Sequence, residues 1–213
     1  MIKSIIFDMD GTLLDSSYAM TLSVNYVRKS YGLAPIKKEY LELIINEPCV
    51  DLPMKLYNVD EYSQEHRDRF AKHYLANANL HVKPYDGAHE LLKSLHVKGY
   101  TLSIATNASD FFAHNMLKGQ GMLDFFSFVV GANNVERSKP NPDMLHHISK
   151  LSSIPLENSL LVGDSVKDEG AANNANIDFL FASWGYGKSY NNTTKSFKNI
   201  KELNKYLLTD LTH

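Results

Sequence analysis

Side chains able to hold a metal ion and a phosphate group occur in four short motifs that lie far apart in the chain. These motifs are Asp8-Met9-Asp10-Gly11-Thr12, Thr106-Asn107, Lys139-Pro140, and Gly163-Asp164-Ser165 with Asp168 nearby. Carboxylates are hard oxygen ligands suited to Mg²⁺, which usually takes one or two of them together with phosphate oxygens. Ammonium, hydroxyl and amide groups can donate hydrogen bonds to the phosphoryl oxygens. The residue types therefore indicate a phosphate site that contains Mg²⁺.

The candidate metal ligands are the carboxylates of the first and last motifs. We expect Asp8, Asp10 and Asp164 to hold Mg²⁺. Asp168 has two possible roles, support of the metal site or stabilisation of a helix start through the helix dipole. The phosphate-binding groups would be Thr106, Asn107 and Lys139, from the two middle motifs.

The first motif places two carboxylates two residues apart, which suits a two-step phosphoryl transfer. Asp8 would attack phosphorus and form a covalent intermediate, which splits one difficult step into two easier ones. Asp10 would protonate the leaving alkoxide and later deprotonate the attacking water. The two carboxyls must then differ in environment, with Asp8 ionised and Asp10 protonated at the start.

Apolar runs that end in polar or small residues predict the strands that position these motifs. The runs lie at 4–7, 100–105, 126–130, 159–162 and 177–181. Helical spacing between them is found at 88–95, 111–118, 142–151 and 167–175. Strands that alternate with helices of this length predict parallel βαβ units and an α/β, Rossmann-like sheet. The motifs would then meet at the carboxyl edge of the sheet, where open α/β folds bind ligands.

Residues 16–82 show helical patterns and no convincing strand, with a break near 46–50. We therefore expect an α/β core of residues 1–15 and 83–213, and an inserted helical domain of residues 16–82.

Composition excludes several classes of protein. The chain has 213 residues, 44% hydrophobic and 22% charged, with a net charge of -2. This is an ordinary globular composition with no basic face to suggest a nucleic-acid partner. No stretch approaches the roughly 18 apolar residues of a membrane span, and no signal peptide is evident. Cys49 is the single cysteine, so an intrachain disulfide is impossible. We expect a cytoplasmic protein with a small partner, as a monomer or a dimer.

In order and spacing, the four motifs resemble those of the haloacid dehalogenase superfamily, and the resemblance covers essentially the whole chain. It implies a Rossmann-like core with a helical cap inserted between the first and second motifs. It further implies a Mg²⁺-dependent phosphatase that acts on a small phosphorylated metabolite.

The chain is most similar to the phosphoglycolate phosphatase and β-phosphoglucomutase group. In that group a loop after the second cap helix sets substrate specificity, often with Gly-x-Pro, whereas this sequence has Asn46-Glu47-Pro48. Asn46 and Glu47 are therefore candidate specificity residues. Tyr18 is a third candidate, because it lies close in sequence to Asp15 and Ser16.

Three alternatives have to be weighed. A phosphomutase of the same fold would return the phosphoryl group to a sugar phosphate. A dehalogenase does not need the acid at Asp10. A catalytically silent binding or regulatory protein would not need Asp8, Asp10, Lys139 and Asp164 together. A phosphatase accounts best for all four residues.

Overall fold

The computed structural model describes residues 1–47, 50–188, 191 and 193–209. Its centre is a six-stranded parallel sheet with the order β5-β4-β1-β6-β7-β8. The strands are β1 (Ser4–Phe7), β4 (Thr101–Thr106), β5 (Phe128–Gly131), β6 (Ser159–Gly163), β7 (Asp178–Ala182) and β8 (Lys195–Phe197). The predicted α/β, Rossmann-like fold is confirmed.

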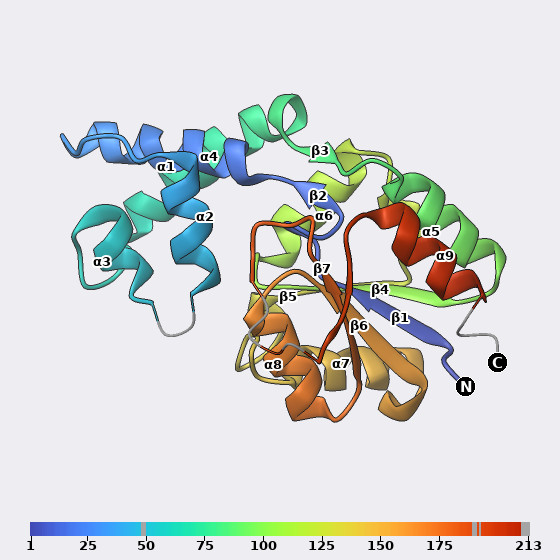
Figure 1. Cartoon of the computed structure of the whole chain (residues 1–213). Coiled ribbons are helices and arrows are strands. Elements are labelled where there is room, and N and C mark those ends of the chain that lie inside the picture. Colours follow the sequence, from blue (N-terminus) through green and yellow to red (C-terminus); the bar gives the residue numbers. More distant parts are fainter. Residues whose placement is uncertain (48–49, 189–190, 192, 210–213) are drawn as a thin grey trace.

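Helices cover both faces of this sheet (Figure 1). Because side chains alternate along a strand, Ile5 and Phe7 of β1 enter one apolar cluster and Ile6 enters another. Burial on both faces explains why β1 reads as a continuous apolar run.

The cluster around Ile5 and Phe7 is covered by α5 (Ala88–Val97), α6 (Asp110–Gly119) and α9 (Ile200–Thr209). The cluster around Ile6 is covered by α7 (Asp143–Ser152) and α8 (Val166–Ala175). Three short 3-10 helices lie in the connections: η1 (Leu123–Phe125), η2 (Ala132–Asn134) and η3 (Leu156–Asn158).

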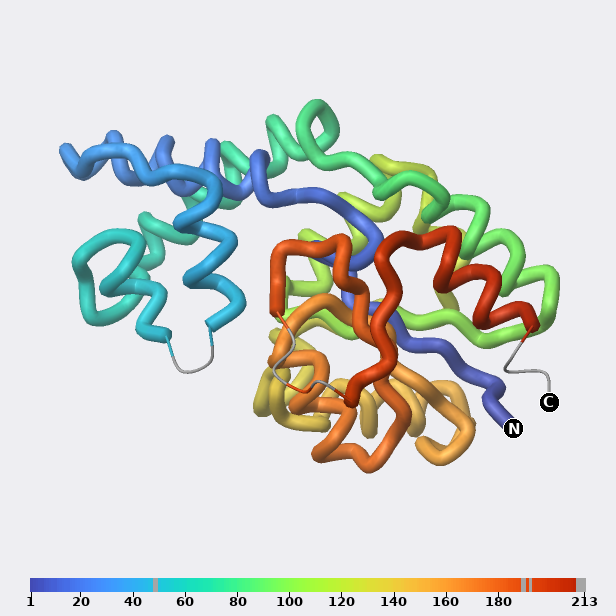
Figure 2. The backbone as a smooth tube through the Cα atoms, in the orientation of Figure 1, coloured from blue at the N-terminus to red at the C-terminus, as the bar shows by residue number. Residues whose placement is uncertain are grey.

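Four further helices form a segment to one side of the sheet (Figures 1 and 2). They are α1 (Ser17–Ser30), α2 (Lys38–Asn46), α3 (Leu52–Tyr57) and α4 (Gln64–His81). They enclose an apolar cluster of their own, formed by Val24, Val27, Leu41, Ile44, Leu56 and Tyr57. The chain enters and leaves this segment through an antiparallel pair, β2 (Leu14–Asp15) and β3 (Lys83–Pro84).

Aromatic packing and two hydrogen bonds join the helical segment to the core. The rings of Phe70 and Tyr74 in α4 both meet Phe112 of α6 edge to face, with ring centroids 6.2 and 5.6 Å apart. The Tyr74 hydroxyl donates to the Met116 sulfur at 2.8 Å. The ammonium of Lys167 in α8 donates to the Ile45 carbonyl at 2.6 Å. The helical segment is thus held over one end of the sheet.

Several elements were not predicted from the sequence: β2, β3, the 3-10 helices η1, η2 and η3, and also β8, α3 and α9. Strand β8 contains one buried residue, Phe197, so it carries little apolar signal. Helix α3 has six residues and too few turns to show a helical period. Helix α9 shows a clear apolar stripe, including Leu203 and Leu207, that packs against the core. Sequence reasoning passed over this stripe.

Among the described residues, no helix combines the length and the apolar character needed to cross a membrane.

Helix α5 offers a matched test of the core packing. Leu95 is fully buried in the core, while Val97, two residues further on, is 78% exposed. Leu95→Ala should lower the free energy of unfolding by about 2–5 kcal/mol, because it removes buried methyl groups and leaves a cavity. Val97→Ala should change it by less than about 0.5 kcal/mol. Urea unfolding measures both, and equal losses in the two variants would contradict the packing described here.

Candidate active site

The first and last motifs lie side by side because their strands are neighbours in the sheet. Phe7, the last residue of β1, is in register with Ile104 of β4 and with Val162 of β6. The Asp8 amide continues this pairing and donates to the Val162 carbonyl at 2.8 Å. Asp8 and Asp164 therefore leave the sheet at nearly the same level, at its carboxyl edge.

A tight turn after Asp8 reverses the chain beside Asp164. The Met9 carbonyl accepts hydrogen bonds from the amides of Leu13 and Leu14, both at 3.0 Å. Gly11 sits in this turn with φ of 87°, a left-handed conformation that other residues adopt only with strain. A Cβ atom at Gly11 would also collide with the Asp164 carboxylate. The glycine thus permits both the turn and the close approach of the two loops.

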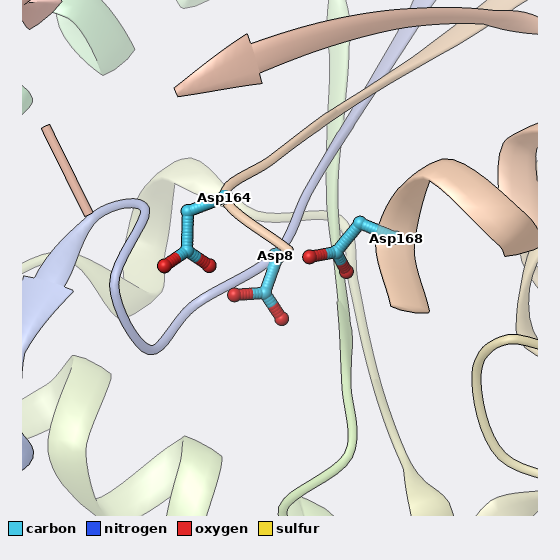
Figure 3. A group of neighbouring side chains, drawn as sticks. All are labelled: Asp8, Asp164 and Asp168. Carbon is cyan, nitrogen blue, oxygen red and sulfur yellow. The ribbon is translucent and has the colours of Figure 1, made fainter. Parts of the chain in front are cut away.

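Three buried carboxylates meet at this edge. Ligand atoms of Asp8, Asp164 and Asp168 all lie within 4.8 Å of one another. The residues come from the loop after β1, the loop after β6 and the first turn of α8, and Figure 3 shows their carboxyl groups gathered together. Their exposed fractions are 6%, 2% and 1%. Such a set of hard oxygen donors fits Mg²⁺.

Lys139 supplies the compensating positive charge. Its ammonium donates to Asp8 Oδ1 at 2.7 Å, to Asp168 Oδ1 at 2.5 Å and to the Ala105 carbonyl at 2.7 Å. An ammonium has three hydrogens, so all three are used. Lys139 therefore lies between two carboxylates and fixes both of them.

Asp168 caps the start of α8, one of the two roles considered from the sequence, and also contacts Lys139. Its Oδ2 accepts from the Ser165 amide at 3.1 Å and from the Ser165 hydroxyl at 2.5 Å, in a capping box at the start of α8. Its Oδ1 receives the Lys139 ammonium. The same side chain thus starts the helix and belongs to the acidic group.

The loop that follows β7 anchors Asp164. The amides of Tyr186 and Gly187 donate to Asp164 Oδ2 at 3.0 and 2.9 Å. The indole of Trp184 donates to the Thr12 carbonyl at 3.0 Å. Gly185 and Gly187 let this loop approach closely, because a Cβ atom at either position would collide with Asp164.

Asp10 lies in a separate environment. Its Oδ1 accepts a hydrogen bond from the Ser16 hydroxyl, and the Ser16 oxygen lies 3.2 Å from the Tyr186 hydroxyl. The Asp10 carboxylate is outside the group formed by Asp8, Asp164 and Asp168. Ser16 and the Tyr186 side chain were not chosen from the sequence as site residues. No sequence signal marks them, because only the fold brings together positions 170 residues apart.

Burial shifts the protonation of these groups in the metal-free protein. Burial raises the pKa of Asp8 to about 7, against the lowering effect of Lys139. Burial, with the nearby charges of Asp8 and Asp168, also raises the pKa of Asp164. Burial alone would lower the pKa of Lys139, but Asp168 and Asp8 outweigh it and raise that pKa above its usual range. The cluster holds more negative charge than one lysine balances, so a bound cation would be stabilised there.

Thr106 and Asn107, the residues of the second motif, make local contacts at the same edge of the sheet. The Thr106 hydroxyl accepts from the Ala108 amide at 3.1 Å. The Asn107 side chain donates to the Lys139 carbonyl and accepts from the Lys139 amide, both at 3.0 Å. Asn107 thereby fixes the backbone that carries Lys139.

A cavity of about 630 Å³ opens above the carboxylates, between the core and the helical segment. The sequence-chosen residues that line it are Asp8, Asp10, Asn46, Thr106, Asn107, Lys139, Asp164 and Asp168. Glu47 lines a smaller neighbouring hollow together with Asn46. Tyr18 is 50% exposed, packs edge to face on His81 and does not line the cavity. Pro48 and Cys49 lie outside the described residues.

Comparison with known proteins decides the family. Residues 5–182 match the model of a family described as haloacid dehalogenase-like hydrolase. The chain belongs to the haloacid dehalogenase-like hydrolases.

Curated relatives and solved structures agree with this assignment. A phosphoglycolate phosphatase of Aquifex aeolicus (strain VF5) is 28% identical over 87% of this chain and 87% of its own. A phosphoglycolate phosphatase of Pseudomonas fluorescens (strain Pf0-1) is 30% identical over 86% of this chain and 70% of its own. The crystal structure of a predicted phosphoglycolate phosphatase from Haemophilus somnus 129pt has a TM-score of 0.84 at 25% identity and covers 97% of this chain and 98% of its own. The chain is thus a hydrolase of the phosphatase type.

Asp10 should give the metal-free protein a pH-dependent stability. Burial raises the pKa of Asp10 to about 6, against the Ser16 hydrogen bond and the charge of Lys139. Between about pH 4 and about pH 6 the folded state then keeps a proton that the unfolded chain has lost, so the free energy of unfolding should fall as the pH rises. Asp10→Asn should reduce this fall, as measured by urea unfolding in EDTA. Asp124→Asn, at an exposed position away from the site, should leave it unchanged; the same pH profile in wild type and Asp10→Asn would contradict the shift.

Proposed function

We propose that the chain hydrolyses a small phosphate monoester with Mg²⁺, through a phosphorylated Asp8. The proposal rests on the buried group of Asp8, Asp164 and Asp168, which lies at the floor of a cavity of about 630 Å³. Lys139 lies between two members of this group. Uncatalysed hydrolysis of such esters is extremely slow, with enzymatic accelerations up to roughly 10²¹-fold. The negative charge of the phosphoryl group repels a carboxylate nucleophile, and cations gathered around that carboxylate would reduce the repulsion.

The residues present fit Mg²⁺. Asp8 and Asp164 would hold the ion, with Asp10 as a further ligand and Asp168 in support through Lys139. When bound, Mg²⁺ would neutralise phosphoryl charge and fix the orientation of the phosphate. It would also favour the ionised form of Asp8, against the effect of burial.

Asp8 is the nucleophile in this proposal. One of its carboxylate oxygens bonds to phosphorus as the bond from phosphorus to the ester oxygen breaks. Lys139 keeps Asp8 in place through the 2.7 Å contact, while Thr106, Asn107 and backbone amides after Asp8 donate to the phosphoryl oxygens.

Asp10 handles the protons. With a pKa of about 6 it is poised to exist in both forms near neutral pH. It gives its proton to the leaving alkoxide, then takes one from the water that attacks phosphorus. The second step releases inorganic phosphate and regenerates the Asp8 carboxylate. Ser16 donates to Asp10 and lies 3.2 Å from the Tyr186 hydroxyl, so the surroundings of Asp10 differ from those of Asp8 and the two carboxylates can serve different roles.

Residues 16–82 act as a cap domain in this proposal. Their helices form one wall of the cavity, and the Lys167 contact to Ile45 ties the end of α2 to the core. Closure of this wall would exclude water during the first step and select the substrate by its alcohol part. Asn46 is placed to contribute, since it lines the cavity.

Substitutions in the first motif test the mechanism. Asp8→Asn should abolish turnover because the amide cannot attack phosphorus. Asp10→Asn should lower kcat by about 10²–10⁴-fold, the usual contribution of a general acid or base, and should accumulate phosphorylated protein. Phosphate release and intact-protein mass spectrometry measure the two effects.

A matched control is Asp86→Asn, because Asp86 is highly exposed and pairs only with Lys201 at the surface. Its activity should equal that of the wild type. Unchanged hydrolysis by the Asp8→Asn protein would refute the proposed nucleophile.

Metal removal tests the cofactor separately. EDTA should eliminate phosphate release, and added Mg²⁺ should restore it. Mg²⁺ should also raise the melting temperature of the wild type, because a ligand that binds the folded state stabilises it. It should raise the melting temperature of Asp164→Asn much less. Full activity in EDTA would refute the metal requirement.

A further inference from the structure

We infer that the alcohol part of the substrate is neutral and predominantly apolar, and that the cap wall of the cavity is built to receive it. This inference rests on the proposed function and adds the class of ester. It concerns the side of the cavity opposite the carboxylates, whose residues come from α1, α2, α3 and α4. The cap residues that line it are Met20, Ile45, Asn46, Leu52, Phe70 and Tyr74.

None of these six described cap residues carries a positive charge. The two polar side chains among them are already engaged. The Asn46 amide donates to the Glu42 carbonyl at 3.0 Å, and the Tyr74 hydroxyl donates to the Met116 sulfur at 2.8 Å. The surface offered to the alcohol part is therefore made mainly of aliphatic and aromatic carbon.

An aromatic cluster gives this surface a fixed shape. Phe70 and Tyr74 stack with their ring centroids 5.4 Å apart and 11° between their planes. Phe112 of α6 meets both rings edge to face. All three residues line the cavity, and Met116 beside them does too. Such rings bury large areas of an apolar group at a low cost in side-chain entropy.

The charges that line the cavity disfavour an acidic alcohol part. Among the described residues they are four aspartates, at positions 8, 10, 164 and 168, and two lysines. Lys139 is bound to Asp8, Asp168 and the Ala105 carbonyl. Lys167 belongs to the core helix α8 and donates to the Ile45 carbonyl at 2.6 Å. A carboxylate on the alcohol part would therefore be desolvated without a dedicated cation on the cap.

The neighbouring hollow strengthens this conclusion. It is lined by the acidic residues Glu42 and Glu47 on the cap side, with Lys188 of the core. Glu42 is already paired with Lys38 at 2.7 Å. The charged cap residues that line this hollow are thus the two glutamates, and the lysine that pairs with one of them is not among its lining residues.

A set of four phosphate esters tests the class. Benzyl phosphate and 4-carboxybenzyl phosphate have leaving alcohols of nearly equal acidity and differ by one carboxylate, while 2-phosphoglycolate is small and acidic. With Mg²⁺, kcat/KM for benzyl phosphate should exceed that for each acidic ester by at least about tenfold. Glucose 6-phosphate, a neutral polyol ester, should also be a poorer substrate than benzyl phosphate. A higher kcat/KM for either acidic ester or for the polyol ester would overturn the inference and leave the proposed phosphatase activity intact.

Two variants assign the preference to the cap wall and the aromatic cluster. Leu52→Lys should raise kcat/KM for 4-carboxybenzyl phosphate relative to benzyl phosphate by at least about tenfold, because it adds the missing cation. Phe112→Ala should lower kcat/KM for benzyl phosphate by at least about tenfold, with the inhibition constant of inorganic phosphate unchanged. Its matched control is Phe111→Ala, since Phe111 is 57% exposed on the same helix and does not line the cavity. Equal effects of the two phenylalanine variants, or an unchanged preference in Leu52→Lys, would contradict the assignment.

Binding of non-hydrolysable analogues separates this inference from the proposed chemistry. Calorimetric titration of the Mg²⁺-loaded protein should show tighter binding of benzylphosphonate than of 4-carboxybenzylphosphonate, again by at least about tenfold. This preference without turnover of any ester would support the neutral pocket and refute the phosphatase proposal. Equal or reversed affinities would refute the pocket.

Discussion

The ammonium of Lys139, buried between Asp8 and Asp168, is the interaction on which the rest of the site depends. Three carboxylates with ligand atoms within 4.8 Å of one another could not all be ionised in a buried position without a compensating charge. Lys139 provides part of this compensating charge, and neighbouring segments of the core hold its ammonium and its backbone in place. Strand β4 offers the Ala105 carbonyl, Asn107 clamps the Lys139 backbone, and α8 brings Asp168.

The charges at this edge of the sheet do not balance, and the proposed function uses the surplus negative charge. One lysine does not offset Asp8, Asp164 and Asp168. In the metal-free protein burial, together with the neighbouring aspartates, raises the pKa of Asp8 and of Asp164. A site with surplus negative charge and hard oxygen donors stabilises a divalent cation. The divalent cation and Lys139 together would then supply the positive charge that a phosphoryl dianion requires.

In the proposed function, the sheet edge carries the chemistry and the helical segment selects the substrate. The acidic group lies on loops that leave adjacent parallel strands, and the sheet register leaves little freedom in the position of Asp8 or Asp164. The facing wall belongs to helices with their own apolar core, joined to the sheet by the short β2 and β3 pair. Part of that wall packs in this separate cluster, whereas Tyr74 of α4 belongs to the apolar core of the sheet.

The sequence by itself predicted the fold class, which the structure confirms, and it suggested the chemistry that is proposed for the motifs. Apolar runs that end at Asp8 and at Asp164 carry the strand signal and the carboxylates together, so local pattern was enough to predict a parallel sheet with a phosphate site at its edge. The motifs around Asp8, Thr106 and Asp164 could be recognised because each lies at the end of a strand or directly after it.

Only the tertiary structure decided which groups touch. Ser16 and Tyr186 flank Asp10 from positions 170 residues apart, and no spacing in the sequence encodes that contact. The direction of Lys139 toward two carboxylates, the outward position of Tyr18 and the apolar cap wall likewise depend on how helices pack across the cavity. Side-chain periodicity reports which face of an element is buried, but the partner on the other side of that face is fixed by packing between distant segments.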